Sequence, residues 1–542
     1  MVKSVVDLAR EDSTTLLATG VPADAAARYR ALGLWVGQTH WDFLEEAILR
    51  HSQLPAATDR YRSLTYGQLG ASISSARAAL AAKGIAPGDK VVVQLPNSVA
   101  FVEAIAALFS LGAVPVFALP AHGALEIRHF CEISGAVAYL GSPPKPSEGE
   151  SVVESLNTET PQVATIEIDE SLPQPWVVDS SVKDVEPVQV EPSALAFLQL
   201  SGGTTAIPKL IPRTHDDYLY SVRRSVEICD LRRNDVMMVV LPCAHNFTMS
   251  SPGILGALYT GAHVVIAADP SPTTCMRTIA RHAVTHVALV PPLLLSWLNS
   301  PTRGDHDLSS LRTLWVGGAK LSDTAARRVG PDLGCQLQQV FGMAEGLVNY
   351  TRLDDDLETV VQTQGKPMSE HDEVKVLDDD GHPVPQGEPG LLYTRGPYTI
   401  RRYYRAPEHN ARSFTEDGFY RTGDIVRQRP SGHLVVVGRD KDQINRGGEK
   451  IAPEAVENEL LAHESIHDVS VVGLPDEVLG ERVCAYLIAR PGADAAIPGP
   501  GELRRFLRHR GLASFAIPDD FRVVEKFPQT GVGKVSKKHQ RQ

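Results

Sequence analysis

The sequence lacks the cysteine patterns that would indicate a zinc site, a redox motif or a disulfide framework. Its six cysteines are scattered, and none forms a CxxC pair or a His/Cys cluster with the spacing of zinc ligands. Isolated cysteines of this kind are typical of reduced, mostly buried thiols. We therefore expect a cytoplasmic protein.

An excess of positive charge and long apolar runs are also missing. Lys and Arg number 53 against 65 Asp and Glu, which gives a formal net charge of −12. Because phosphate backbones are bound by basic surfaces, a nucleic acid is disfavoured as the main partner. The first residues contain no apolar run of signal-peptide length, and no uninterrupted apolar stretch is long enough to span a bilayer. We expect a soluble protein without a membrane partner.

Length and hydrophobic patterning predict an α/β protein with more than one domain. A chain of 542 residues exceeds what one hydrophobic core usually serves. From Leu64 to about Leu321, short apolar runs such as residues 90–95 and 113–117 alternate with helical segments. This alternation is typical of parallel strands covered by helices on both faces. After Gln364, shorter strands separated by Gly and Pro turns predict a small β-rich subdomain.

A domain break is predicted at residues 438–442, where glycine-rich turns flank a charged run. The proposed division is a large N-terminal domain of residues 1–438, a connecting segment of residues 439–442, and a smaller C-terminal domain of residues 443–542. The C-terminal part has a mixed pattern, with a helix expected at 453–462 and a strand at 469–473, so we expect an α+β fold there.

The motif Ser201-Gly-Gly-Thr-Thr-Ala-Ile-Pro-Lys209 has the composition of a phosphate-binding loop. Glycines let backbone amides approach phosphate oxygens, hydroxyls add donors, and the lysine adds positive charge. It is not a Walker A loop, because Pro208 precedes the lysine and Leu210 follows it. A flexible surface turn could have the same composition. Its place directly after the apolar strand at 195–200 favours a phosphate site.

Further short motifs follow in order: Phe341-Gly-Met-Ala-Glu345, Tyr420-Arg-Thr-Gly-Asp424, Gly438-Arg-Asp-Lys-Asp442 and Gly531-Val-Gly-Lys534. The Glu345 carboxylate could hold Mg²⁺ against phosphates, and the Asp424 carboxylate could accept both hydroxyls of a ribose. Taken singly, each motif would also suit a turn or, for Lys534, a solvated basic tail.

This ordered set resembles the adenylate-forming superfamily, which includes acyl-CoA synthetases and nonribosomal peptide adenylation domains. Several segments are more narrowly similar to the stand-alone aryl acid-AMP ligases, which activate 2,3-dihydroxybenzoate or salicylate for siderophore and related peptide assembly. The resemblance covers nearly the whole chain. The segments that carry it are Leu198-Gln-Leu-Ser-Gly-Gly, Ile211-Pro-Arg-Thr-His-Asp-Asp-Tyr, His245-Asn246, Gln339-Val-Phe-Gly-Met-Ala-Glu-Gly-Leu-Val-Asn-Tyr and Asn445-Arg-Gly-Gly-Glu-Lys.

The resemblance implies ATP and Mg²⁺ as cofactors and a role for each matching residue. Lys534 and Lys209 are the expected catalytic lysines, and Glu345 is the expected metal ligand. Lys441 is the expected hinge between two orientations of a mobile C-terminal domain, and Gly447, Gly448 and Lys450 belong to the expected thiol-transfer loop. The expected nucleotide-binding residues are Ser201, Gly202, Gly203, Thr204, Thr205, Gly318, Val340, Phe341, Gly342, Asp424 and Arg439, and the expected acid-binding residues are His245, Asn246, Phe247, Ser251, Gly317, Ala319 and Val348.

By the same resemblance, the reaction has two steps. An aryl acid reacts with ATP to form aryl-AMP and pyrophosphate, and the aryl group then passes to the phosphopantetheine thiol of a separate aryl carrier protein. A rival is an aryl-CoA ligase that uses free coenzyme A, and another is a catalytically silent scaffold that retains the fold. Intact Lys209, Glu345, Asp424, Arg439 and Lys534 argue against the silent scaffold.

The resemblance does not identify the acid. Ser251 and Val348 match positions where dihydroxybenzoate enzymes tend to have Ser and Val, whereas Phe247 matches salicylate enzymes. A serine hydroxyl could bond the 3-hydroxyl of the acid. We favour 2,3-dihydroxybenzoate slightly, with salicylate, a methylsalicylate and 3-hydroxypicolinate as alternatives.

Overall fold

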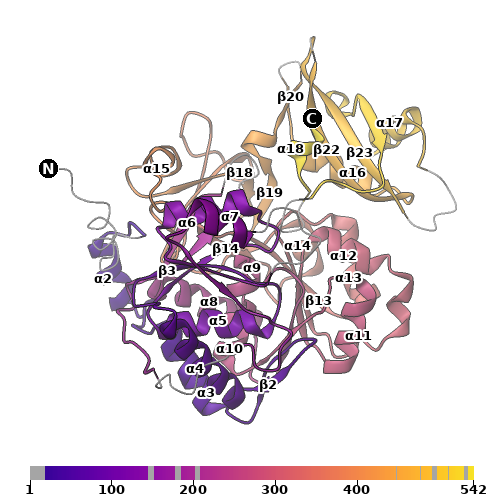
Figure 1. Ribbon diagram of the computed structural model, residues 1–542. Coiled ribbons are helices and arrows are strands. Elements are labelled where there is room, and N and C mark those ends of the chain that lie inside the picture. Colours follow the sequence, from indigo (N-terminus) through magenta and orange to yellow (C-terminus); the bar gives the residue numbers. More distant parts are fainter. Residues whose placement is uncertain are drawn as a thin grey trace.

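The computed structural model describes residues 19–143, 152–176, 185–201, 208–446, 449–476, 478–490, 497–510, 512–529 and 535–541. A large body contains three sheets, and a smaller C-terminal unit, yellow in Figure 1, lies at one end of it. This arrangement confirms the predicted fold class, a large α/β part with a β-rich subdomain and a smaller α+β part.

A six-stranded sheet is built from strands between residues 90 and 214. Its order is β6-β5-β3-β4-β7-β8, and its strands are parallel except for β8. Every residue of β3 is buried, as expected for a strand covered on both faces. The strands are β3 (Lys90–Gln94), β4 (Val114–Phe117), β5 (Ala138–Gly141), β6 (Ala164–Glu167), β7 (Leu195–Leu200) and β8 (Leu210–Thr214).

A nine-stranded sheet takes most of its strands from residues 236–367. Its order is β15-β14-β13-β12-β11-β9-β10-β1-β2. Its middle strands are parallel, and β2, β14 and β15 are antiparallel to their neighbours. The strands are β1 (Pro55–Thr58), β2 (Ser63–Thr65), β9 (Val236–Val239), β10 (His263–Ile266), β11 (His286–Leu289), β12 (Thr313–Gly317), β13 (Gln336–Met343), β14 (Gly346–Tyr350) and β15 (Lys366–Pro367).

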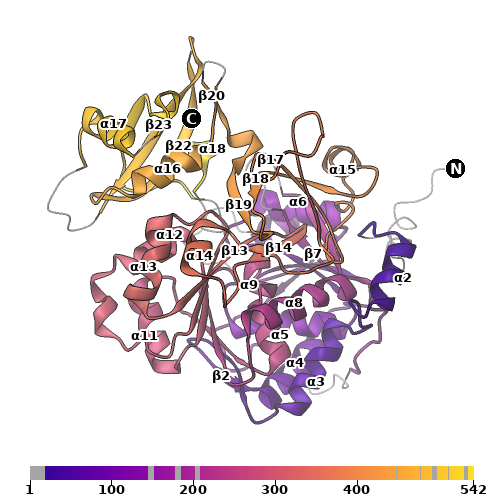
Figure 2. The same ribbon diagram turned by 180° about the vertical axis from the view of Figure 1, so that it is seen from behind.

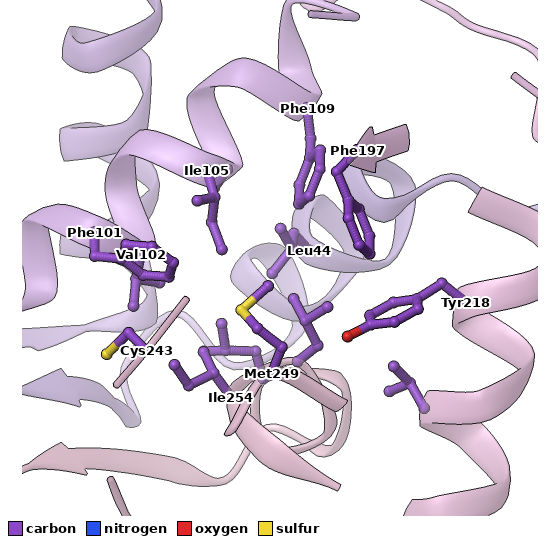
Figure 3. Close-up of a cluster of buried hydrophobic side chains, with 14 of the residues drawn as sticks. Leu44, Phe101, Val102, Ile105, Phe109, Phe197, Tyr218, Cys243, Met249 and Ile254 are labelled. Carbon is purple, nitrogen blue, oxygen red and sulfur yellow. The ribbon is translucent and has the colours of Figure 1, made fainter. Parts of the chain in front are cut away.

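A layer of helices fills the space between these two sheets and forms the main hydrophobic core. The helix α5 is buried along its whole length, because its sequence is apolar except for Glu103 and Ser110. The buried Glu103 carboxylate is paired with Arg62. Figure 3 shows side chains from α5, α3, α8, α9 and α10 meeting in this layer. The helices are α3 (His40–Arg50), α4 (Tyr66–Ala82), α5 (Val99–Ser110), α8 (His215–Cys229), α9 (Asn246–Ser250) and α10 (Gly253–Thr260).

Other helices cover the outer faces. Near the six-stranded sheet lie α6 (Ala124–Ser134) and α7 (Val152–Glu159). Near the nine-stranded sheet lie α11 (Pro272–His282), α12 (Pro291–Leu298), α13 (Asp323–Leu333) and α14 (Leu357–Gln362), with the 3₁₀ turn η2 (Pro301–Asp305). The helix α2 (Ala23–Ala31) lies near the N-terminal end (Figure 2). Within the described ranges, no helix has both the length and the apolar character needed to cross a membrane.

The predicted β-rich subdomain is an antiparallel sheet in the order β16-β17-β18-β19. Its strands are β16 (Glu373–Leu377), β17 (Pro389–Arg395), β18 (Tyr420–Gln428) and β19 (Leu434–Arg439), with α15 (Pro407–Ser413) between β17 and β18. The last strand leads directly into the 3₁₀ turn η3 (Asp440–Asp442), so this sheet is the part of the large body from which the C-terminal unit departs.

The C-terminal unit has a sheet and hydrophobic core of its own. The expected helix at 453–462 is α16 (Pro453–Leu461), and the expected strand at 469–473 lies inside the longer β22, which pairs with β23 along nearly its whole length. The remaining elements are β20 (Ile444–Arg446), β21 (Glu449–Ile451), β22 (Ile466–Asp476), β23 (Gly480–Ala489), β24 (Asp520–Val523), α17 (Pro500–His509), η4 (Ser514–Ala516) and α18 (Lys537–Gln540).

Candidate functional site

A cavity of about 710 Å³ lies between the large body and the C-terminal unit. Its size is in the range of small-molecule and cofactor sites. Many residues expected to bind nucleotide or acid line it, together with the expected hinge lysine: Gly318, Ala319, Val340, Phe341, Gly342, Asp424, Arg439 and Lys441. The opposite wall is contributed by the C-terminal unit through Glu454, Glu457, Val535, Lys537 and Arg541, among others.

The carboxyl ends of β12 and β13 open onto this cavity, which is where open α/β sheets usually bind ligands. Gly317 pairs with Val340 so closely that a Cβ atom on Gly317 would lie 2.8 Å from the Val340 carbonyl oxygen. Gly318 has φ +86°, in the left-handed region that favours glycine. The strand therefore turns sharply here, and its backbone forms part of the cavity wall.

Asp424 and Arg439, on the paired strands β18 and β19, form an ion pair at one side of the cavity. The Arg439 Nε atom lies 2.7 Å from Asp424 Oδ1, and the carboxylate is buried while the guanidinium is half-exposed. The negative charge of Asp424 raises the pKa of Arg439. This pair offers a buried acceptor and a charged donor fork at the same place.

Glu345 lies in the connection between β13 and β14 and is buried beside two tyrosines. The Tyr403 hydroxyl donates a hydrogen bond to Glu345 Oε1 at 2.8 Å, and the hydroxyls of Tyr403 and Tyr420 are 3.0 Å apart. The Lys209 ammonium lies 4.8 Å from the centre of the Tyr403 ring. The expected metal carboxylate and the expected phosphate lysine are therefore brought together around one tyrosine.

The carboxylate of Glu345 fits a magnesium ion that binds together with a phosphorylated ligand. Within the described ranges, the group of three side chains close enough to hold a metal by themselves is Asp378, Asp380 and His382, all exposed, and Glu345 is not among them. Mg²⁺ usually takes one or two carboxylates and completes its shell with phosphate oxygens and water. Glu345 offers a single buried carboxylate, which matches that pattern.

The ends of the expected phosphate loop are bonded to each other. The Ser201 amide donates to the Lys209 carbonyl at 2.9 Å, and the Lys209 amide donates to Ser201 Oγ at 2.9 Å. Gly202, Gly203, Thr204 and Thr205 lie outside the described residues. The closed ends hold Lys209 in place for its contact with Tyr403.

The expected acid-binding residues converge around the short helix α9. His245 caps this helix by accepting the Phe247 amide on Nδ1 at 3.3 Å. The Phe247 ring packs on Gly317, because a Cβ atom there would lie 3.2 Å from Phe247 Cζ. Val348 pairs with Gly342, a residue of the cavity wall, and Phe247, Ser251 and Val348 are all buried.

Asn246 is held by a tyrosine from the core. The Tyr218 hydroxyl donates to Asn246 Oδ1 at 2.9 Å, and the Tyr218 ring packs edge-on against Phe197 with centroids 4.6 Å apart. Figure 3 shows Tyr218 directed from α8 into the helical layer toward Met249. With its oxygen already bonded, the Asn246 side chain has its amide N–H groups left to donate.

The expected residues of the C-terminal unit are only partly described. Lys441 lines the cavity from η3, and burial together with the nearby Arg439 lowers its pKa. Lys534, Gly447 and Gly448 lie outside the described residues. Lys450 belongs to β21, which pairs with β20, and Figure 1 shows β20 at the end of the unit that faces away from the large body. Val535, one residue after Lys534, lines the cavity.

Comparison with known proteins assigns the family. The sequence profile of the AMP-binding enzymes matches residues 44–404, and that of the AMP-binding enzyme C-terminal domain matches residues 455–534. The chain belongs to the AMP-binding enzyme family. The resemblance to adenylate-forming enzymes is thereby confirmed.

Relatives of this AMP-binding enzyme are similar over nearly their whole length. The 2,3-dihydroxybenzoate-AMP ligase of Bacillus subtilis is 52% identical over 95% of this chain and 96% of its own. The salicyl-AMP ligase / salicyl-S-ArCP synthetase of Mycobacterium tuberculosis is 42% identical over 95% of this chain and 93% of its own. The apo structure of Mycobacterium smegmatis MbtA has a TM-score of 0.73 and 40% identity, covering 97% of this chain and 99% of that one.

Sequence reasoning assigned no role to the tyrosines of this AMP-binding enzyme's site. Tyr218 belongs to the segment 211–218 that contributed to the family resemblance, so its motif was visible although its contact was not. Tyr403 lies in Arg401-Arg-Tyr-Tyr-Arg405, which has no spacing that predicts a site. Its bond to Glu345 joins residues 58 positions apart, a contact that no local pattern indicates.

Proposed function

We propose that this AMP-binding enzyme activates an ortho-hydroxy aryl carboxylic acid with ATP and Mg²⁺, forming aryl-AMP and pyrophosphate. The phosphopantetheine thiol of an aryl carrier protein then attacks the carbonyl carbon of aryl-AMP, so that the aroyl group forms a thioester and AMP is released. The product serves the biosynthesis of a siderophore or a related nonribosomal peptide. The observation that carries the proposal is one cavity wall on which the expected nucleotide residues Gly318 and Gly342 lie beside the expected acid residue Ala319. Two further expected acid residues adjoin that wall, because Gly317 precedes Gly318 and Val348 pairs with Gly342. The names of its relatives, a 2,3-dihydroxybenzoate-AMP ligase and a salicyl-AMP ligase, support the same reaction.

In the proposed nucleotide site, Asp424 accepts the ribose hydroxyls and Arg439 donates to the nucleotide. Gly318, Val340, Phe341 and Gly342 form the wall beside it. Ser201, Gly202, Gly203, Thr204, Thr205 and Lys209 bind the phosphates, and Glu345 holds Mg²⁺ against them.

In the first step, an oxygen of the acid's carboxylate attacks the α-phosphorus of ATP, and the bond to the pyrophosphate oxygen breaks. Negative charge increases at the reacting phosphate, and we assign its neutralisation to Lys534 and Lys209. No covalent bond to the protein forms in this step. Positioning and electrostatic stabilisation are therefore the contributions required of the side chains.

In the proposed acid pocket, His245, Asn246, Phe247, Ser251, Gly317, Ala319 and Val348 surround the ring. The Asn246 amide, with its oxygen bonded to Tyr218, donates to the carboxylate and ortho-hydroxyl region. Ser251 favours 2,3-dihydroxybenzoate and Phe247 favours salicylate, so both remain candidates for the acid.

In the second step, the C-terminal domain of residues 443–542 rotates about the segment 439–442, with Lys441 as the hinge, relative to the N-terminal domain of residues 1–438. The rotation withdraws Lys534 and brings the loop of Gly447, Gly448 and Lys450 to the acceptor thiol. Support for this comes from their places: Val535 is at the cavity, whereas β20 and β21 lie on the far side of the unit. Hinges of this kind are a few residues that absorb a backbone change.

Substrate-dependent exchange between ATP and labelled pyrophosphate tests the proposal. The acids to compare are 2,3-dihydroxybenzoate, salicylate, 6-methylsalicylate, 3-hydroxypicolinate, benzoate and several amino acids. Exchange with an ortho-hydroxy aryl acid, followed by transfer to a loaded aryl carrier protein in preference to free coenzyme A, is the expected result. Exchange with amino or fatty acids alone contradicts the pocket assignment, preference for coenzyme A favours an aryl-CoA ligase, and no exchange at all favours a silent scaffold.

A further inference from the structure

We propose that Tyr403 is a positioning residue that orients the Glu345 carboxylate toward the metal and holds Lys209 next to it. The inference rests on the proposed function, because it assigns an orienting group to the proposed metal and phosphate residues. It adds a residue that neither the motifs nor the family resemblance indicated. The contacts around Tyr403 carry it.

The direction of the hydrogen bonds around Tyr403 follows from the acceptors present. Its hydroxyl has one hydrogen and lies 2.8 Å from Glu345 Oε1 and 3.0 Å from the Tyr420 hydroxyl oxygen. An ionised carboxylate is a stronger acceptor than a phenol, so the hydrogen of Tyr403 points to Glu345. Tyr420 then donates to Tyr403. This two-step relay ends on one oxygen of the carboxylate.

The bond from Tyr403 makes the two oxygens of Glu345 unequal. Oε1 already accepts a hydrogen bond, so Oε2 would be the oxygen that is left to hold Mg²⁺. The backbone on either side is also held: the Ile400 amide donates to the Glu345 carbonyl at 2.8 Å, and Arg213 Nη1 donates to the Ala344 carbonyl at 2.8 Å. A carboxylate with a fixed backbone and one bonded oxygen has little freedom left, which is how outer groups orient metal ligands.

The ring of Tyr403 makes a second contact, with Lys209. The Lys209 ammonium lies 4.8 Å from the ring centre, within the range of a cation–π contact. The hydroxyl and the face of one side chain therefore contact the proposed metal carboxylate and the proposed phosphate lysine, respectively. Because the two contacts use different parts of the residue, they can be removed separately.

Tyr403 is rigid enough to orient its neighbours. It is 2% exposed, its ring packs edge-on against Phe414 with centroids 5.7 Å apart, and its backbone makes two bonds to Asn410. The Tyr403 amide donates to Asn410 Oδ1 at 2.7 Å, and Asn410 Nδ2 donates to the Tyr403 carbonyl at 3.1 Å. These contacts hold the Tyr403 side chain in one orientation.

The test compares Tyr403→Phe with Tyr404→Phe by equilibrium titration of ATP and Mg²⁺ into the full chain. Tyr404 is the adjacent buried tyrosine, whose ring faces Lys90 and Arg405 instead. We expect Tyr403→Phe to raise the Mg²⁺ concentration needed for half-maximal ATP binding about 10- to 100-fold, the usual effect of removing a partner of a metal ligand. Tyr404→Phe should leave it unchanged. Equal Mg²⁺ dependence in the two variants overturns the proposal.

Two further measurements distinguish positioning from loss of folding. In pyrophosphate exchange, Tyr403→Phe should raise the KM for Mg²⁺·ATP and leave the KM for the acid unchanged, whereas a general structural defect would raise both and overturn the proposal. Tyr403→Leu should weaken ATP binding further even at saturating Mg²⁺, because the contact with Lys209 is lost as well. Failure of the wild-type chain to bind ATP contradicts the proposed function itself, whereas wild-type binding with unaltered variants contradicts this inference alone.

Discussion

The two walls of the cavity differ in the kind of contact that holds them. Behind the wall of the large body, Phe247, Ser251 and Val348 are buried, and Asn246 is fixed by a hydroxyl from the core. They do not line the cavity themselves, but Val348 pairs with Gly342, which does. Close packing of this kind resists a change in shape. That side is suited to selecting one acid by shape complementarity.

On the side of the C-terminal unit, the wall contains several charged groups beside the apolar Leu461, Val469 and Val535. The Lys537 ammonium lies 2.8 Å from Glu457 Oε1, and Arg541 Nη2 lies 3.2 Å from Asp442 Oδ1. The contacts across to the large body are polar as well: Asn299 Nδ2 and His467 Nδ1 are 2.8 Å apart, and the Asp323 amide donates to Asn458 Oδ1 at 3.2 Å.

Polar contacts between domains are readily exchanged for contacts with water, so they separate at a lower cost than an apolar core does. We therefore propose that the two sides have different roles. The proposed acid pocket lies in the tightly packed body, and the proposed catalytic lysine, Lys534, belongs to the unit held by polar contacts. Four predictions test this division.

The largest effect is expected for Lys534→Ala. We expect adenylation, measured by pyrophosphate exchange, to slow by about 100- to 1000-fold, because a charge that stabilises the transition state is lost. Transfer of the aryl group from purified aryl-AMP to the loaded carrier protein should change far less. Equal losses in both half-reactions would contradict the division of labour between two orientations of the C-terminal domain.

Asp372→Asn tests the hydrogen bonds that hold Val348, a residue of the proposed acid pocket, in place. Tyr398 accepts the Val348 amide at 3.0 Å and donates to Asp372 Oδ2 at 2.7 Å. Burial raises the pKa of Asp372 to about 7, above its usual value near 4, so between these values the folded state binds more protons than the unfolded state. The contribution of Asp372 to stability is therefore fully present below about pH 4 and is lost as the pH rises to 7.

An asparagine oxygen can accept the same bonds without ionising. The free energy of unfolding of Asp372→Asn relative to wild type should therefore increase by roughly 2 kcal/mol between pH 5 and pH 8. Urea unfolding at the two pH values measures it. A difference that does not depend on pH would show that this carboxyl does not titrate in the folded protein.

Ser251→Ala is expected to have a moderate effect that depends on the acid. Loss of a hydroxyl that bonds the 3-hydroxyl should lower kcat/KM for 2,3-dihydroxybenzoate about tenfold, since an unpaired buried hydroxyl costs roughly 1–3 kcal/mol. Salicylate, which lacks that hydroxyl, serves as the control in the same variant. Equal losses for the two acids would exclude Ser251 as the discriminating residue.

The smallest effect is expected for Asn458→Ala, which removes one contact between the two walls. Exposed or partly exposed polar contacts contribute about 1 kcal/mol or less, so we expect the rate of either half-reaction to change by less than about fivefold. Both rates are measured as for Lys534→Ala. A loss as large as that of a pocket variant would mean that the C-terminal unit is held more firmly than its polar contacts indicate.

Much of the fold could be predicted because local sequence patterns indicate its helices and strands. The apolar runs at 90–95 and 113–117 contain β3 and β4, and the helix expected at 453–462 is α16. Apolar periodicity depends on neighbouring residues, so it is visible without a structure. The glycine-rich and charged motifs were visible for the same reason.

The sequence alone shows which chemical groups this enzyme has and in what order: the carboxylates, the lysines, the glycine turns and the family they belong to. Which of these groups meet is visible in the folded structure and not before. The bond from Tyr403 to Glu345, the support of Asn246 by Tyr218 and the packing of Phe247 on Gly317 each join distant parts of the chain. Such contacts depend on how sheets and helices pack against each other, and a local pattern contains no information about the distant residue that completes the pair.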